Sequence, residues 1–141
     1  MKVLFICTGN TCRSPLAEAL GRSMYPGIEF ASAGLMAEEA APASAGAAAV
    51  AAENGLNLAG HRARRLTGTM LSEVDVALTM TAAQSRLVRE RFPVRAAGVT
   101  CLGAAAGTGR DVPDPWGGGP EAYRACYRAL KELLERMDWR E

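Results

Sequence analysis

The chain has 141 residues, of which 49% are hydrophobic and 22% are charged, a composition typical of a globular domain with one hydrophobic core. Its 16 basic and 15 acidic residues leave a net charge of +1, so overall charge favours neither nucleic acid nor an anionic membrane as a partner, and any anion site must be local. No apolar run has the length needed to span a bilayer, and we expect a single cytoplasmic domain over residues 1–141.

Apolar segments alternate along the chain with patterns typical of helices. Strands are predicted at Lys2–Cys7, Ile28–Ala33, Val74–Met80 and Ala97–Leu102. Between and after them, helices are predicted at Ser14–Met24, Ala43–Glu53 and Thr81–Phe92, with a short helix capped by Thr67 and a last helix from Pro120. Pro42 is expected to open the second of these helices. In the helix at Thr81–Phe92, we expect Ala82, Leu87 and Val88 to face inward. Such alternation indicates an α/β fold, a four-stranded parallel sheet with helices on both faces, in which ligands bind beyond the carboxyl ends of the strands.

The most informative segment is the polar loop that joins the first strand to the first helix, Cys7-Thr8-Gly9-Asn10-Thr11-Cys12-Arg13-Ser14. A loop closed over so few residues turns backbone amides inward, and the helix that starts near Arg13 adds unpaired amides and the positive end of its dipole. The sequence therefore predicts a phosphate-binding loop after the first strand, with Thr8, Gly9, Asn10, Thr11 and Cys12 around the bound dianion.

Three side chains of this loop suit phosphoryl transfer. Cys7 lies at the floor of the loop, where the field that attracts a phosphate also favours a thiolate nucleophile. Arg13 has the forked guanidinium that binds two phosphate oxygens and follows them into the transition state. The Ser14 hydroxyl can donate a hydrogen bond that steadies Cys7 as nucleophile and as leaving group.

The reaction also needs an acid for the leaving group and a base for the hydrolytic water. We expect Asp114 to serve as both, because two flanking prolines stiffen its backbone and Trp116 shields it from water. Asp111 is the competing candidate, and both aspartates have the alternative of being ordinary turn residues.

The remaining cysteines and the single histidine do not have the spacing of a metal site, so we expect no metal and no cofactor. Cys7 and Cys12 lie on opposite sides of the small loop, and a reversible disulfide between them would protect the nucleophile from overoxidation. The alternative is that Cys12 is a buried filler beside Arg13.

With these motifs in this order, the chain resembles the low-molecular-weight protein-tyrosine phosphatases over nearly its full length. The matching features are the Cys7-to-Ser14 loop followed by Pro15, the Ser32-Ala33-Gly34 turn, the late Asp114-Pro115-aromatic motif and the closing amphipathic helix. The resemblance implies a phosphocysteine intermediate on Cys7, phosphate binding by the loop amides and Arg13, acid–base work by Asp114, phosphorylated proteins as partners and inorganic phosphate as product.

Some residues depart from the tyrosine-directed pattern of that family. Only one aromatic residue, Trp116, follows Asp114-Pro115, and the segment Leu35-Met36-Ala37-Glu38 lacks the aromatic that commonly lines the pocket. Thr11 stands at a loop position that is often aliphatic. In this respect the chain resembles the bacterial protein-arginine phosphatases, in which the matching threonine favours phosphoarginine and the aspartate also contacts the guanidinium.

Three alternative functions stay open. Phosphotyrosine is the nearest, because Trp116 can stack on a phenyl ring, and Thr11 would then be loop filler. Arsenate reduction needs a further pair of redox cysteines, which residues 79–90 do not contain. A phosphoprotein-binding module would grip phosphate without cleaving it. The cluster Arg62, Arg64 and Arg65 is expected to form a solvated surface.

Overall fold

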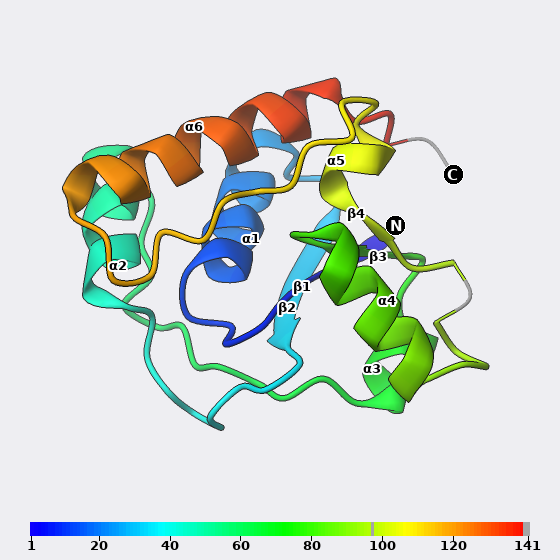
Figure 1. Cartoon of the computed structure of the whole chain (residues 1–141). Coiled ribbons are helices and arrows are strands. Elements are labelled where there is room, and N and C mark those ends of the chain that lie inside the picture. Colours follow the sequence, from blue (N-terminus) through cyan, green and yellow to red (C-terminus); the bar gives the residue numbers. More distant parts are fainter. Residues whose placement is uncertain (97, 140–141) are drawn as a thin grey trace.

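The computed structural model describes residues 1–96 and 98–139 (Figure 1). In chain order its elements are β1 (Lys2–Cys7), α1 (Arg13–Met24), β2 (Glu29–Gly34), α2 (Ala45–Glu53), α3 (Gly68–Ser72), β3 (Val76–Thr79), α4 (Ala82–Arg91), β4 (Thr100–Cys101), α5 (Leu102–Ala105) and α6 (Pro120–Arg136). The alternation of strands and helices that the sequence predicts is confirmed.

The strands form one parallel sheet in the order β2-β1-β3-β4. β1 is central and completely apolar in its middle, as expected for a strand covered on both faces. Its last residue, Cys7, pairs with Gly34 of β2, and Ile6 pairs with Thr79 of β3. The carboxyl end of β1 therefore opens between two neighbouring strand ends, where a loop can collect residues from both.

Alternate residues of β1 face two separate hydrophobic clusters. Val3, Phe5 and Cys7 belong to the larger one, which contains buried residues of α1, α2 and α6. Leu4 and Ile6 belong to the smaller one, which contains Leu71 of α3 and Val88 of α4. The helices thus cover both faces of the sheet, with α1, α2 and α6 together on one of them (Figure 1).

Several local expectations were wrong. Helix α2 starts after Ser44, whose side chain accepts a hydrogen bond from the Ala47 amide, so Pro42 lies before the helix instead of opening it. In α4 only Val88 of the three expected inward residues is buried, because a buried Gln84 and Ser85 fill the face expected for Ala82 and Leu87. The fourth strand has two residues, and position 97 of its expected range lies outside the described residues.

Helix α5 has no counterpart among the predicted elements. It begins directly after β4 and brings Gly103 against the backbone of Arg110, where a Cβ atom would collide with the Arg110 carbonyl. Glycine is required at this position by close approach. In residues 1–96 and 98–139, no helix combines the length and the apolar composition needed to cross a membrane.

Candidate active site

A cavity of about 210 Å³ lies over the loop that follows β1. Its walls contain nine residues, namely Cys7, Thr8, Gly9, Asn10, Thr11, Cys12, Arg13, Asp114 and Trp116. The structure thus brings together every expected site residue except Ser14. That side chain is fully buried beneath the loop, where it contacts the Cys7 sulfur.

Two hydrogen-bonding groups converge on the Cys7 sulfur. The Ser14 Oγ lies 2.8 Å from the Cys7 Sγ, and the Asn10 backbone amide donates to the same sulfur at 3.3 Å. The Asn10 side-chain amide donates to the Ser14 Oγ at 2.8 Å. Since that bond occupies a lone pair of the Ser14 oxygen, the hydroxyl proton is free to point at the sulfur and stabilise a thiolate.

Asn10 organises the loop from its centre. Its backbone has φ of 56°, the left-handed region in which asparagine is tolerated better than most residues. The side-chain oxygen accepts from the Arg64 backbone amide at 2.9 Å, and the side-chain nitrogen also donates to the Ser32 hydroxyl at 2.9 Å. The backbone carbonyl of Asn10 lies 2.7 Å from the His61 Nε2. These contacts fix the strained turn and aim its amide at Cys7.

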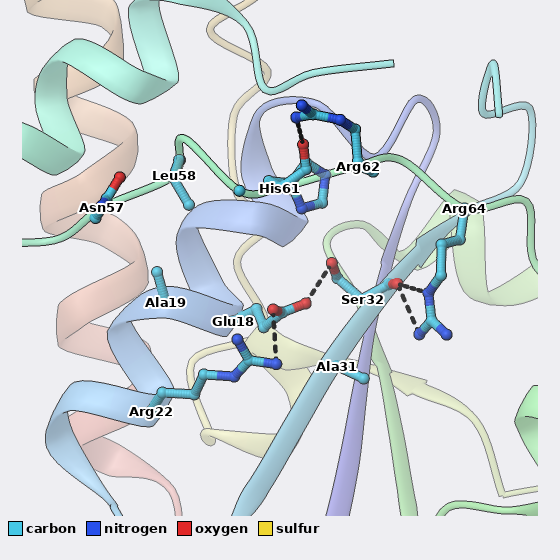
Figure 2. A pocket seen from close by; sticks show the side chains of 11 residues that line it. Glu18, Ala19, Arg22, Ala31, Ser32, Asn57, Leu58, His61, Arg62 and Arg64 are labelled. Atoms are coloured by element: carbon cyan, nitrogen blue, oxygen red, sulfur yellow. Dashed lines mark hydrogen bonds and ion pairs between the residues drawn. The ribbon is translucent and has the colours of Figure 1, made fainter. Parts of the chain in front are cut away.

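Behind the loop the hydrogen-bond network continues to a second cavity of about 500 Å³, shown in Figure 2. There the Ser32 hydroxyl donates to the Glu18 carboxylate at 2.7 Å, and Arg22 pairs with the same carboxylate at 3.0 Å (Figure 2). Buried Ser32 is thereby held by charged groups of α1, and it in turn holds Asn10.

The arginine cluster is not simply a solvated surface. All three side chains are exposed, yet Arg64 donates to the Ser32 carbonyl and Arg65 to the Ala37 carbonyl. Arg62 donates to the backbone of its own segment, at His61 and Ala59. Arg64 and Arg65 therefore fasten the segment after α2 to β2 and to the loop that follows it.

Arg13 joins the loop to the late aspartate segment. Its Nη1 donates to the Val112 carbonyl at 3.0 Å, and its Nη2 lies 3.7 Å from the Asp114 Oδ2. The guanidinium is 7% exposed, whereas the Asp114 side chain is 54% exposed. A nearly buried cation at the cavity floor is a strong anchor for an anion, and it holds the Asp114 segment over the same cavity.

The two candidate aspartates have different surroundings. Asp111 accepts a hydrogen bond from the Ala82 amide at the first turn of α4, at 2.9 Å, and does not line the active-site cavity. Asp114 lines it and accepts from the Trp116 amide at 3.0 Å. That turn leaves the Trp116 indole 72% exposed, so the expected shielding of Asp114 from water is incomplete.

Cys12 lies at the start of α1 and contacts helices α2 and α6. Its thiol donates to the Ser44 Oγ at 3.2 Å and lies 3.7 Å from the Tyr123 hydroxyl. Burial raises the pKa of Tyr123 and raises the pKa of the Cys126 thiol to about 12. Cys7 and Cys12 are both free thiols, so a disulfide between them stays a prediction.

Gln84 and Gly34 also position the loop, a role that the sequence did not predict for either of them. The Gln84 side chain accepts from the amides of Met80 and Thr81 and donates to the Thr8 hydroxyl at 3.1 Å. Gly34 packs so closely under the loop that a Cβ atom would lie 2.7 Å from the Thr8 carbonyl oxygen. The signal for Gln84 is its place three residues after the helix cap Thr81.

Within residues 1–96 and 98–139, no group of three or more His, Cys, Asp or Glu side chains could hold a metal ion.

Comparison with known proteins agrees with this geometry. A protein-arginine-phosphatase of Geobacillus stearothermophilus is 39% identical over 138 residues, which are 96% of this chain and 93% of that protein. The low molecular weight protein-tyrosine-phosphatase Etp of Escherichia coli K12 is 36% identical over 139 residues, 96% of this chain and 93% of that protein. The solved C7S mutant of the YwlE arginine phosphatase, with a phosphorylated active-site serine, has a TM-score of 0.92 at 32% identity and covers 96% of this chain and 92% of its own.

A family model for low molecular weight phosphotyrosine protein phosphatases matches residues 2–138. With the fold, the loop and its cysteine in agreement, the chain belongs to this family of cysteine-based protein phosphatases.

Proposed function

We propose that this protein is a protein-arginine phosphatase that works through a phosphocysteine intermediate on Cys7. The observation that carries the substrate assignment is the place of Thr11, which lines the same cavity as Cys7 and Asp114. Similarity to a protein named as an arginine phosphatase supports the same assignment.

In the first step, the phosphoryl group lies in the cradle of loop amides, with two oxygens on the Arg13 guanidinium. The Cys7 thiolate attacks phosphorus, and the bond between phosphorus and the guanidine nitrogen breaks. Asp114 gives its proton to the leaving nitrogen, so the phosphorylated guanidinium leaves as the free guanidinium of arginine. The sulfur–phosphorus bond is the intermediate.

In the second step, the Asp114 carboxylate takes a proton from a water molecule as that water attacks phosphorus. The sulfur–phosphorus bond breaks, inorganic phosphate leaves and the Cys7 thiolate returns. The Ser14 hydroxyl, 2.8 Å from the sulfur, stabilises the negative charge that sulfur regains, and so makes Cys7 a better leaving group.

Thr11 and Asp114 suit a planar cation better than a phenyl ring. The threonine is smaller and more polar than the aliphatic residues common at this position, and its hydroxyl can accept a hydrogen bond from a guanidinium N–H. The Asp114 carboxyl group, also on the cavity wall, gives its proton to the leaving nitrogen and can accept a hydrogen bond from a neighbouring N–H of the same guanidinium.

A phosphotyrosine phosphatase is the second candidate, and the exposed Trp116 favours it. An indole that lines the cavity and is 72% exposed has a free face on which a phenyl ring can stack. It is also the one aromatic residue among the nine in the cavity wall.

The experiment that tests the proposal compares phosphate release from phosphoarginine and phosphotyrosine proteins, side by side and under reducing conditions. We expect a higher kcat/KM for phosphoarginine. A higher kcat/KM for phosphotyrosine would favour the second candidate and show that Thr11 does not determine specificity. The Cys7→Ser variant is the blank. If the wild-type chain turns over substrate and this variant binds phosphate without turnover, the protein is an enzyme and not a binding module.

A further inference from the structure

We propose that the groove between α2 and the segment that leads into α6 binds an apolar side chain of the substrate, one or two residues from the phosphorylated residue. The groove has a volume of about 440 Å³. This inference rests on the proposed function, since it extends the same site toward the rest of a protein substrate.

The groove lies next to the active-site cavity. Trp116 lines both, so its exposed indole stands at their junction. On the other side, the amide of Ser44, which lines the groove, donates to the carbonyl of Thr11 at 2.9 Å. The Ser44 hydroxyl accepts a hydrogen bond from the Cys12 thiol. A residue of the groove is therefore hydrogen-bonded directly to two residues of the cavity wall.

Small and apolar side chains form most of the groove. Its lining consists of Ser44, Ala45, Gly46, Ala49, Val50, Glu53, Trp116, Gly117, Gly118, Gly119, Pro120 and Tyr123. The one formal charge in this lining, Glu53, is paired in two hydrogen bonds with Arg124 at 2.8 and 3.0 Å. The groove therefore presents apolar surface with its charge already neutralised, which matches an aliphatic or aromatic side chain and not a charged one.

The walls are packed and do not depend on the ligand for their shape. A Cβ atom on Gly46 would collide with the Tyr123 ring, so α2 lies directly on α6. Gly118 donates its amide to the Pro115 carbonyl at 2.9 Å, and a Cβ on Gly118 would lie 2.6 Å from the Ala122 Cβ. The segment of residues 117–119 is thus folded tightly against α6, beside α2 (Figure 1).

The place of the groove suits a neighbouring residue of the substrate. The groove and the active-site cavity share Trp116, and an extended chain advances about 3.3–3.6 Å per residue, so we expect a residue one or two positions from the phosphorylated residue to enter the groove while the phosphoryl group stays over Cys7. Apolar contact of this kind is the same in the ground state and the transition state, and it acts through KM.

The test uses short peptides that carry one phosphorylated residue, either phosphoarginine or phosphotyrosine according to which the wild-type chain hydrolyses. Leucine replaces glycine at one flanking position at a time, up to two residues on either side. We expect kcat/KM to rise about tenfold, ~1.4 kcal/mol, at one or more of these positions, through a lower KM.

Ala49 of α2 is exposed and lines the groove, whereas Ala52 of the same helix is exposed and does not. In Ala49→Trp, which fills the groove, the ratio of kcat/KM between the leucine and glycine peptides should fall to about one. Ala49→Glu, a smaller change, should lower the ratio as well. Ala52→Trp is the matched control and should keep the wild-type ratio.

Two results would overturn the inference: a wild-type chain that gains nothing from leucine at any of the flanking positions, or a leucine preference that survives in Ala49→Trp and Ala49→Glu. Because each ratio is taken within one protein sample, loss of folded protein does not imitate the expected result. Failure of the proposed function gives results different from failure of the groove assignment. One is a higher kcat/KM for phosphotyrosine than for phosphoarginine. The other is no turnover of any phosphopeptide by a chain that still hydrolyses p-nitrophenyl phosphate. The latter result would overturn the groove assignment too.

Discussion

At the scale of single residues, Asp111 and Asp114 carry the same carboxylate three positions apart and have different surroundings. One binds the Ala82 amide of α4, and the other lines the cavity above Cys7. Their order in the sequence does not reveal this division, because it depends on where α4 begins in space. The flanking prolines favour Asp114 as the acid, and the position of its side chain on the cavity wall supports that choice.

If Asp114 protonates the leaving group, Asp114→Asn will lower kcat/KM for phenyl phosphate, which has a poor leaving group, by roughly 100-fold or more. The effect on p-nitrophenyl phosphate will be far smaller, because its leaving group departs with little need for a proton. Steady-state kinetics on the two esters measures the difference. Asp111→Asn is the matched control, and its effect on kcat/KM should be the same for both esters. An equal loss of kcat/KM on both esters in Asp114→Asn would remove Asp114 from the acid role.

Thr11→Ile should shift the ratio of kcat/KM for phosphoarginine over phosphotyrosine about tenfold toward phosphotyrosine, ~1.4 kcal/mol of transition-state binding. The isoleucine is larger and cannot hydrogen-bond a guanidinium. Thr11→Val, which keeps the shape of threonine and loses its hydroxyl, separates the two causes. An unchanged ratio in Thr11→Ile would show that Thr11 does not determine specificity.

At the scale of elements, helix α4 supports the catalytic loop through Gln84. The sequence Thr81-Ala82-Ala83-Gln84 has the spacing of a capping box, and the structure contains one. This local half of the arrangement is readable from the sequence. The bond from Gln84 to Thr8 joins residues 76 positions apart, and no local pattern indicates it.

Gln84→Ala should lower the free energy of unfolding by about 2 kcal/mol, because it leaves buried amides of the Met80–Thr81 turn without their acceptor. Urea denaturation measures this change. Leu87→Ala, at a position of the same helix that is 51% exposed, is the control and should change stability by less than about 0.5 kcal/mol. If the two variants are equally stable, Gln84 is not the support described here.

The same contrast applies to the other elements. Strands β1 and β2 and helices α1 and α6 follow from the hydrophobic patterns of their own segments, and Pro120 in the first turn of α6 marks where that helix begins. Helix α5 does not follow from such a pattern, since it is short and depends on contact with the Arg110 backbone. Of the strand predicted at residues 97–102, the described part contains only the two residues of β4, which pair with β3. The inward face expected for α4 was wrong because polar Gln84 and Ser85 are buried, where Gln84 hydrogen-bonds Thr8 of the loop and Ser85 hydrogen-bonds Thr79 of β3.

At the scale of the whole molecule, the sheet joins remote parts of the chain at the carboxyl end of β1. The Cys7-to-Ser14 loop could be predicted from sequence because it is contiguous. The support from Ser32, His61 and Arg64 could not. It depends on β2 and the segment after α2 meeting at Asn10, which is a consequence of the complete fold.

The buried thiol of Cys126 should make the stability of the whole domain fall in alkaline solution. Burial raises its pKa from 9.0 to about 12, so the folded thiol keeps its proton while the unfolded one loses it. The stability from this group is complete below pH 9 and is lost as pH rises toward 12. Urea denaturation from pH 8 to 11 should give a slope that is shallower in Cys126→Ala by roughly 1 kcal/mol per pH unit. Equal slopes, with reductant in all samples, would contradict this.

The central claim is that Cys7 takes the phosphoryl group of a phosphoarginine protein and passes it to water. The most direct measurement is a quench of the reaction with a phosphoarginine protein within the first turnover, in a mildly alkaline denaturant that preserves P–N and P–S bonds, followed by mass spectrometry of the peptide that contains Cys7. We predict a phosphoryl group on Cys7 that appears before free phosphate and decays as phosphate is released. Phosphate released in full turnover with Cys7 unmodified at every time, or a phosphoryl group on another residue, would contradict the account.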